Sequence, residues 1–307
     1  MSEGLIIKKN IRVKEFAEKL HLKVLCCAEQ EIELCTRNIN RPGLQLTGLW
    51  KFFDSQRIQI VGPSENEYLK SLSKEKMEET IKEYFQKKFP CIVFSRGIEA
   101  EKSFIKYGEE FSIPVFSSRM VTSELYNSIS DFLKDCLAKE EQLHGVLVDV
   151  NGVGILIKGN SGIGKSEIAL ELVSRGHRLA CDDAVIVKRV DDVLIGYAPS
   201  IVRHFMEVRG IGIIDVAALF GAEAVKLEQQ IELVIEVEKW NDKKDYERVG
   251  ENVEFDNILG VDLVKMVIPT SPGRNLAVII ETAASVYRQR MMGFIAAREL
   301  EKRVRKK

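Results

Sequence analysis

Hydrophobic residues at helical spacing alternate with short apolar runs along the first part of the chain. Residues 13–20 place their hydrophobic side chains on one face of a helix, and residues 77–85 repeat a hydrophobic residue every four positions. Short apolar runs predict strands at residues 57–62, 91–94 and 113–116. Because strands that alternate with helices favour a parallel sheet, we predict an N-terminal α/β domain with a largely parallel sheet.

The second half of the chain opens on a predicted β-hairpin. Apolar runs at residues 144–150 and 153–158 flank the pair Asn151-Gly152, which is the strongest short signal for a hairpin. The second arm leads directly into a glycine-rich loop and then into an amphipathic helix over residues 167–173. This arrangement differs from a simple βαβ nucleotide domain, in which the first strand begins alone.

Further elements complete this second α/β domain. Strands are predicted at residues 231–237 and 263–268, and two helices broken near Gly293 follow from Asn275 onward. A helix over about residues 123–141 is predicted to bridge the two halves. The predicted domains are an N-terminal α/β domain, residues 1–135, and a C-terminal catalytic domain, residues 136–307.

Composition and charge exclude several classes of protein. The 45 Lys and Arg residues nearly balance the 46 Asp and Glu residues, so the net charge of −1 favours neither nucleic acid nor a membrane surface as a partner. The six cysteines lack C-x-x-C spacing, which is typical of reduced thiols rather than of disulfides or a zinc site. No apolar run approaches the roughly 18 residues of a membrane span, and the N-terminus has no signal-peptide pattern. We therefore expect a cytoplasmic protein.

The phosphate-binding template G-x-x-x-x-G-K-[ST] is matched between the hairpin and the helix. Glycines in such a loop let successive backbone N–H groups point at phosphate oxygens. Lys165 is positioned to reach the β- and γ-phosphates, and the hydroxyl of Ser166 suits a Mg²⁺ ion. The candidate nucleotide-binding residues are Gly159, Asn160, Ser161, Gly162, Ile163, Gly164, Lys165 and Ser166.

Two aspartates, Asp182 and Asp183, follow the strand that comes after this helix. In P-loop proteins an acidic group at a neighbouring strand end lies beside the γ-phosphate, where it holds Mg²⁺ or accepts a proton from the attacking hydroxyl. Adjacent residues on a strand point to opposite faces, so we expect only one of the two carboxylates to face the phosphate. The alternative is a solvated Asp-Asp turn.

Four other charged or titratable residues are weaker candidates. Glu207 precedes a glycine-rich stretch and either completes a metal shell or forms a surface ion pair with Arg209. Arg248 and Arg274 are loop arginines beside glycines, a setting that suits contact with oxyanions, although most loop arginines have no such role. His144 begins the hairpin, and it either approaches a phosphate or bonds to backbone at a strand start.

Together these segments resemble the bacterial HPr kinase/phosphorylase family, and the similarity runs over nearly the whole chain, to about residue 295. Arg41–Gly48 in the N-terminal half shares it. In the C-terminal half the resemblance lies in residues 144–148, 159–167, 172–179, 182–183, 207–214 and 269–274. Two departures are small, because Asn160 stands where an acidic residue is common and Cys181 replaces a small residue.

The resemblance implies an enzyme that phosphorylates a serine of HPr, the phosphocarrier of the sugar phosphotransferase system, with ATP or pyrophosphate as donor. It also implies phosphorolysis of phosphoseryl-HPr by inorganic phosphate to give pyrophosphate, and through both reactions a role in carbon catabolite repression and sugar uptake. The family assembles as a homohexamer, and its C-terminal P-loop domain resembles the nucleotide domain of phosphoenolpyruvate carboxykinase.

The resemblance also assigns roles by position. The implied catalytic residues are His144, Lys165, Asp183 and Arg248, with Asp183 as the proton acceptor. The implied ligands of Mg²⁺ are Ser166 and Glu207. Residues 206–215 match a segment used in both reactions, and residues 269–274 match a segment tied to dephosphorylation.

Two other functions compete with this interpretation. One is a P-loop kinase of a small molecule. The other is a nucleotide-gated regulatory module that binds a partner and turns ATP over slowly or not at all. An enzyme needs a proton acceptor near the γ-phosphate, which Asp183 offers, whereas a switch needs only the loop and the metal ligands.

Overall fold

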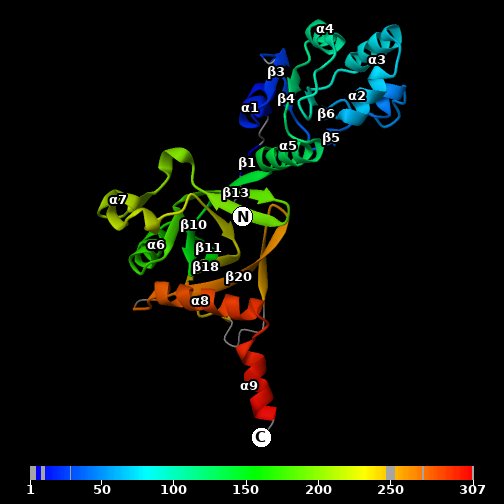
Figure 1. Cartoon of the computed structure of the whole chain (residues 1–307). Helices are drawn as coiled ribbons and strands as arrows, with labels where there is room; N and C mark the ends of the chain where they lie inside the picture. The colour runs from blue at the N-terminus through cyan, green and yellow to red at the C-terminus, as the bar shows by residue number, and fades with distance from the viewer. Residues whose placement is uncertain (1–4, 8–10, 28, 247–252, 272, 306–307) are drawn as a thin grey trace. The chain divides into compact units, whose positions relative to one another are not determined.

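The structure is a computed structural model, and it describes residues 5–7, 11–27, 29–246, 253–271 and 273–305 (Figure 1). The chain forms two compact units. One runs from Lys8 to Ala138, and the other combines Met1–Ile7 with Lys139–Lys307. Within the described residues, no helix is both long enough and apolar enough to span a membrane.

The N-terminal unit is a five-stranded sheet with helices on both faces. Its strand order is β3-β8-β7-β6-β5, in which β5 to β8 pair in parallel and β3 pairs antiparallel with β8 at one edge. The parallel pairings agree with the sequence-based prediction, which missed the antiparallel edge. The elements are β2 (Ile11–Arg12), α1 (Val13–Lys19), β3 (Lys23–Cys26), β4 (Glu33–Leu34), β5 (Ile39–Asn40), β6 (Ile58–Val61), α2 (Pro63–Lys70), α3 (Lys74–Gln86), β7 (Ile92–Phe94), α4 (Lys102–Phe111), β8 (Val115–Ser117) and α5 (Thr122–Cys136).

Alternation along the buried strands separates two cores in this unit. Val93 faces a core that contains residues of α1 and α5, whereas Ile92 and Phe94 face a core that contains residues of α3 and α4. Successive side chains on a strand point to opposite faces, so a strand buried on both faces must be apolar throughout. This explains why the strands of this half appear in the sequence as continuous apolar runs.

The C-terminal unit has three layers. A central sheet of order β12-β10-β11-β18-β20-β19 contains three parallel strands, β11, β18 and β20. A second, antiparallel sheet has the order β1-β9-β13-β14-β17. The strands are β1 (Leu5–Ile7), β9 (Glu140–His144), β10 (Val146–Val150), β11 (Val153–Gly159), β12 (Arg178–Cys181), β13 (Ala184–Val190), β14 (Val193–Tyr197), β15 (Phe205–Val208), β16 (Gly212–Asp215), β17 (Glu228–Ile231), β18 (Leu233–Lys239), β19 (Glu254–Ile258) and β20 (Val261–Thr270).

The helices of this unit are α6 (Lys165–Ser174), α7 (Val216–Phe220), α8 (Leu276–Met291) and α9 (Ala296–Arg305). Val146 and Val148 of β10 face a core shared with α6 and α8, whereas Leu147 between them faces a core shared with the second sheet. The central sheet is therefore buried on both faces.

Two predictions about local structure have opposite outcomes. The hairpin is confirmed, because β10 and β11 pair antiparallel across Asn151 and Gly152, whose φ angles of 54° and 83° suit a tight hairpin turn. The helix predicted to reach Glu141 is wrong at its end, since α5 stops at Cys136 and residues 140–144 form β9. Pairing of β9 with β1 and β13 outweighs the helical propensity of this acidic segment.

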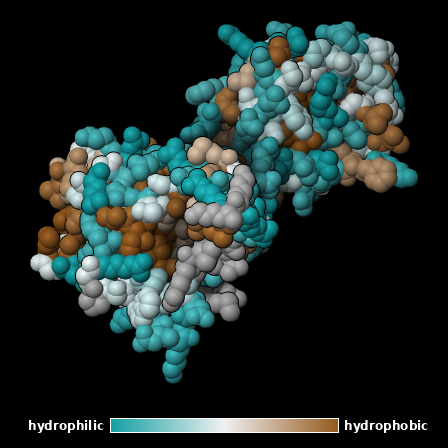
Figure 2. Space-filling model, turned by 90° about the horizontal axis from the view of Figure 1, so that it is seen from below, coloured by the Kyte–Doolittle hydropathy of each residue, from teal (hydrophilic) through white to brown (hydrophobic). Residues whose placement is uncertain are grey.

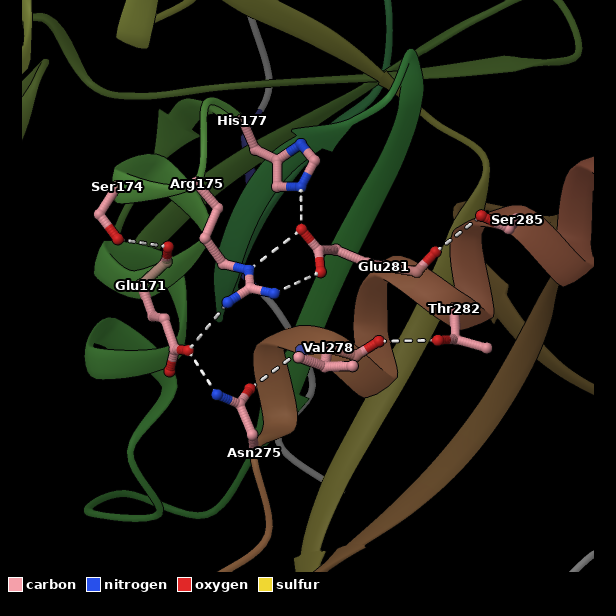
Figure 3. Close-up of polar contacts among 9 residues, drawn as sticks. All are labelled: Glu171, Ser174, Arg175, His177, Asn275, Val278, Glu281, Thr282 and Ser285. Carbon is pink, nitrogen blue, oxygen red and sulfur yellow. Dashed lines mark hydrogen bonds and ion pairs between the residues drawn. The ribbon is translucent and has the colours of Figure 1, made fainter.

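Polar side chains join α6 and the turn after it to α8 (Figure 3). Glu281 of α8 accepts two hydrogen bonds from Arg175, both 3.1 Å long, and lies 2.9 Å from Nε2 of the buried His177. Asn275 caps α8 by accepting the N–H of Val278. Glu281 thereby fixes α8 against the helix that begins at the glycine-rich loop.

Replacing Glu281 by alanine is expected to lower the free energy of unfolding by about 1–2 kcal/mol, because buried His177 loses its partner. The hydrogen bonds from Arg175 and His177 lower the pKa of Glu281. Its stabilising contribution is therefore complete above the unfolded-state pKa, near 4.5, and is lost as the pH falls through the lower folded-state value. Urea denaturation at pH 7 and pH 4 should show a smaller variant effect at pH 4.

Glu299→Ala is the matched control for this variant. Among the described residues, Glu299 forms ion pairs only with Lys302 and Arg303, both exposed pairs on α9 that are worth about 0.5 kcal/mol or less. Equal destabilisation by both substitutions would contradict a special role for Glu281.

Candidate active site

The glycine-rich loop connects the end of β11 to the first residue of α6. At Gly159 a Cβ atom would lie 2.4 Å from the carbonyl oxygen of Val237, so no side chain fits there. Gly164 has a φ of 98° and serves as the N-cap of α6, a left-handed conformation that favours glycine. The template glycines are therefore required by close approach and by backbone conformation, as expected for a loop that presents its N–H groups to an anion.

Lys165 is buried at the start of α6, with its side chain turned back toward the loop. Its ammonium donates to the carbonyl oxygens of Gly159 at 3.0 Å and Asn160 at 3.3 Å, and it lies 3.1 Å from Nε2 of His144. These contacts use all three donors of the ammonium group. Burial lowers the pKa of Lys165, while the nearby carboxylates of Asp183 and Asp182 oppose that shift.

His144 links this lysine to Asp183. Nδ1 of His144 lies 2.9 Å from Oδ1 of Asp183, while Nε2 faces the ammonium of Lys165. Because an ammonium can only donate hydrogen bonds, Nε2 is the acceptor. Nδ1 therefore carries the hydrogen and donates a hydrogen bond to Asp183. His144, the last residue of β9, thus connects Lys165 to the carboxylate of Asp183 through two hydrogen bonds.

Asp182 is buried and contacts the first turn of α6. Its two carboxylate oxygens accept from the hydroxyl of Ser166 at 3.0 and 3.1 Å, and it also accepts the backbone N–H of Glu207. Burial raises the pKa of Asp182 to about 6, although the hydrogen bond from Ser166 acts in the opposite direction. Asp182 therefore fixes the hydroxyl for which the sequence suggested a metal-binding role.

The expectation that the two aspartates point apart is wrong. Both Asp182 and Asp183 line the cavity beside the loop. Asp183 follows the end of β12 and has a φ of 65°, so the chain leaves the extended conformation there. The alternation of side chains applies only while a strand continues, and it fails at this residue.

The hairpin formed by β15 and β16 closes another side of the cavity. Met206 and Val208 are buried in the core, so Glu207 between them points outward to the cavity. Arg209 follows, and its guanidinium nitrogens lie 3.2 and 3.3 Å from the position that a Cβ of Gly162 would occupy. The sequence suggests Arg209 only as a possible surface partner of Glu207, because nothing local in the sequence places this hairpin beside the loop.

The cavity itself has a volume of about 130 Å³. Its lining includes the ammonium of Lys165, the guanidinium of Arg209 and the carboxylates of Asp182, Asp183 and Glu207. Cationic and carboxylate side chains line the same small cavity. The cations suit the phosphate oxygens of a ligand, and the carboxylates suit a metal ion bound to those phosphates. Of the predicted nucleotide-binding residues, the lining includes Ser161, Gly162, Gly164, Lys165 and Ser166, whereas Gly159 and Asn160 contribute carbonyl groups to Lys165 and Ile163 packs against the core.

The oxygen groups at this cavity fit a magnesium ion that is held mainly by its substrate. Ser166, Asp182 and Glu207 offer hydroxyl and carboxylate oxygens, which are the donors that Mg²⁺ prefers. Across the described ranges, no cluster of three or more His, Cys, Asp or Glu residues is arranged to hold a metal. A Mg²⁺ ion bound with a nucleotide usually takes one or two carboxylates and completes its shell with phosphates and water.

One of the two predicted arginines is described, and it lies away from this cavity. Arg248 falls outside the described residues. Arg274 donates to the carbonyl oxygen of Pro269 at 2.9 Å and lines a different cavity, of about 530 Å³, together with Trp240 and Lys265. The described structure thus brings His144, Lys165, Asp183, Ser166 and Glu207 together and places Arg274 elsewhere.

Comparison with known proteins gives matches over both units. The family model for the HPr serine kinase C-terminal domain matches residues 135–304, and the one for the HPr serine kinase N terminus matches residues 11–133. The HPr kinase/phosphorylase of Lachnoclostridium phytofermentans is 48% identical over 96% of each chain, and that of Clostridium beijerinckii is 45% identical over 93% of this chain and 94% of its own. The solved Hpr(Ser) kinase/phosphatase from Coxiella burnetii is 35% identical and covers 50% of this chain and 99% of its own, with a TM-score of 0.46.

Proposed function

This chain belongs to the HPr serine kinase family, and we infer that it transfers a phosphoryl group between a nucleotide or pyrophosphate and a serine of HPr. It phosphorylates HPr with ATP or pyrophosphate, and it removes the phosphate by phosphorolysis, which yields pyrophosphate. The observation that carries this function is the contact chain from Lys165 through His144 to Asp183 beside the glycine-rich loop.

The chain of contacts suits phosphoryl transfer because that reaction depends on positioning and charge more than on covalent chemistry. The amides of the loop are placed to hold the donor phosphates, and the ammonium of Lys165 would exchange one of its contacts with the loop carbonyls for a phosphate oxygen. Asp183 takes the proton of the serine hydroxyl in the forward direction. In the reverse direction the same carboxyl, now protonated, returns that proton to the leaving serine oxygen, as microscopic reversibility requires.

His144 positions Asp183 for this exchange. Its Nδ1–H donates to Asp183 and stabilises the ionised carboxylate, while its Nε2 accepts from Lys165. We propose that Ser166, Asp182 and Glu207 hold Mg²⁺, which when bound neutralises charge on the phosphates. Arg209, and from the family resemblance Arg248, would balance charge on the transferred group.

A protein substrate needs a docking surface next to the cavity, and exposed hydrophobic side chains provide one. Ile211, Ile213 and Leu219 are 74%, 76% and 63% exposed, and they lie on the β15–β16 hairpin and the helix that follows it. Ile213 pairs directly with Glu207, which lines the cavity. Figure 2 shows hydrophobic residues gathered at the left of the larger unit, the side on which Figure 1 places α7. Exposed apolar groups of this kind mark protein-interaction sites.

Replacing Ile213 by aspartate should lower kcat/KM for HPr about tenfold, because a buried charge would disrupt the docked interface. Binding of ATP, measured by calorimetry, should stay unchanged. Phe52→Asp is the matched control, since Phe52 is an 88% exposed hydrophobic residue of the N-terminal unit. An equal loss in both variants, or an altered elution in sizing chromatography for Ile213→Asp alone, would contradict a role in docking.

Arg274→Ala should slow phosphorolysis more than ATP-dependent phosphorylation, by about tenfold in the ratio of the two rates. Arg274 donates a hydrogen bond to the carbonyl oxygen of Pro269, and the family resemblance ties residues 269–274 to dephosphorylation. Both rates are measured on one preparation at matched Mg²⁺, with Arg274→Lys as the charge-conserving control. Equal losses in the two directions would favour a purely structural role.

Two further properties are proposed from the family resemblance. The C-terminal unit is expected to share its architecture with the nucleotide domain of phosphoenolpyruvate carboxykinase, and the antiparallel hairpin ahead of the loop supports this. The assembly is expected to be a homohexamer, which light scattering of the purified chain tests.

The proposed activity is tested by mass spectrometry of HPr after incubation with this protein, ATP and Mg²⁺. The expected result is one added phosphoryl group on a serine. A serine-to-alanine variant of HPr at that position should remain unmodified. ATP consumption without any change in the mass of HPr would instead indicate a small-molecule kinase or a nucleotide switch.

A further inference from the structure

A cavity of about 870 Å³ lies in the N-terminal unit, at the carboxyl ends of β7 and β8. Its walls come from the turn between α1 and β3, from the loop after β7 and from the loop after β8. In open α/β sheets, ligands bind outside the carboxyl ends of the parallel strands. The volume falls in the range of small-molecule sites, about 300–1,000 Å³.

Backbone hydrogen bonds connect the loop after β7 to the loop after β8. The N–H of Arg96 donates to the carbonyl of Met120 at 2.8 Å, and the N–H of Gly97 donates to the carbonyl of Ser118 at 2.7 Å. The hydroxyl of Ser118 also accepts the N–H of Met120 at 3.2 Å. Binding to such a site costs little ordering of the backbone, which is the advantage of a preorganised pocket.

The two basic side chains at this cavity have no charged or hydrogen-bonding partner among the described residues. Within the described residues, the side chains of Lys23 and Arg119 make no hydrogen bond or ion pair, although both line the cavity. By contrast, Arg41, which follows β5, lines a smaller cavity of about 420 Å³ and is already paired with the buried Glu65, at 2.9 Å. Glu99 is the single carboxylate in the lining of the 870 Å³ cavity, so the two basic side chains outnumber it.

The two cationic residues of the lining come from β3 and the loop after β8, whereas two aliphatic ones come from the β7–α4 connection and from α4. Ser117 pairs with Lys23 across the β3–β8 register, which places a hydroxyl next to the ammonium-bearing residue. Ile98 and Ile105 supply half-buried aliphatic surface from the β7–α4 connection and from α4. A ligand matched to this lining carries an anionic group at one end and a flat or apolar group at the other.

We propose that this cavity is a second small-molecule site, which binds a phosphorylated metabolite with an apolar or aromatic portion. The phosphate lies against Lys23 and Arg119, and the apolar portion rests on Ile98 and Ile105. The site belongs to a different unit from the glycine-rich loop, so it does not depend on the proposed catalytic function. Nucleoside monophosphates and sugar phosphates share the phosphate group, and only the former carry the aromatic base.

Hydrogen–deuterium exchange of the full chain, read by mass spectrometry, tests this site and locates the response. Millimolar AMP is expected to slow exchange in peptides that cover residues 95–100 and 117–120, and glucose 6-phosphate is expected to do so more weakly. The variant Lys23→Ser/Arg119→Ser should lose this protection and keep its rate of HPr phosphorylation. Lys102→Ser, a change of an exposed lysine at the start of α4 that is not part of the lining, should keep the protection.

Three results would overturn the proposal. Exchange slowed only in residues 159–167 would assign AMP to the glycine-rich loop. Unchanged protection in the Lys23→Ser/Arg119→Ser variant would rule out phosphate binding by these two residues. Equal protection by AMP and glucose 6-phosphate would remove the role of the apolar surface. A failure of HPr phosphorylation in the wild-type chain would count against the catalytic proposal alone, because the exchange signal does not require turnover.

Discussion

Replacing Lys165 by alanine should reduce both HPr phosphorylation and phosphorolysis by at least about a hundredfold. Lys165 is the buried cation of the glycine-rich loop, and it also anchors His144, which in turn contacts Asp183. The substitution therefore removes a charge from the donor phosphates and releases one end of the contact chain. The measurement is the initial rate in each direction at saturating Mg²⁺ and HPr.

Lys158→Ala is the matched control for this variant. Lys158 lies on β11, seven positions before Lys165, and its ammonium pairs with Asp256 at 2.9 Å rather than facing the cavity. We expect its rates to stay within a few-fold of wild type. A folded Lys165→Ala protein with normal rates would contradict the assignment of the loop to the donor phosphates.

Replacing Asp183 by asparagine should lower the forward rate by about 10²–10⁴-fold while nucleotide binding persists. The amide keeps the shape of the carboxyl group and loses its basicity, so only the proton transfer is removed. The hydrogen bond with Nδ1 of His144 can still form to the amide oxygen, which keeps the imidazole in place. Rates come from phosphorylated HPr by mass spectrometry, and nucleotide affinity comes from calorimetry.

Asp182→Asn separates the roles of the two neighbouring aspartates. Asp182 contacts the hydroxyl of Ser166, so its loss should raise the Mg²⁺ concentration needed for half-maximal rate. If Asp183→Asn stays within a few-fold of wild type and Asp182→Asn loses the reaction at all Mg²⁺ concentrations, Asp182 is the proton acceptor instead.

Local signals in the sequence were sufficient for the glycine-rich loop and its surroundings. Asn151-Gly152 predicts the hairpin, and the template around Lys165 predicts the turn and the helix that follows, because these conformations depend on the residues that adopt them. The parallel strands of the N-terminal unit could also be predicted from the sequence, since strands buried on both faces are apolar throughout.

Features set by contacts between distant segments could not be predicted in this way. Arg209 reaches Gly162 only because the β15–β16 hairpin packs beside the loop, and no periodicity carries that information. The turn of Asp183 toward the cavity depends on a left-handed residue at the end of β12. The strand at residues 140–144 depends on partners far along the chain, which outweighed local helical propensity.

In the proposed mechanism, one cavity carries the phosphoryl group in both directions, with inorganic phosphate as acceptor in the reverse reaction. The most direct test incubates phosphoseryl-HPr with this protein, Mg²⁺ and ¹⁸O-labelled inorganic phosphate, and identifies the product by mass spectrometry. We predict that one molecule of pyrophosphate, bearing the label in one of its two phosphoryl groups, forms for each phosphoserine lost. Release of unlabelled inorganic phosphate without labelled pyrophosphate would show hydrolysis by water and would contradict the account.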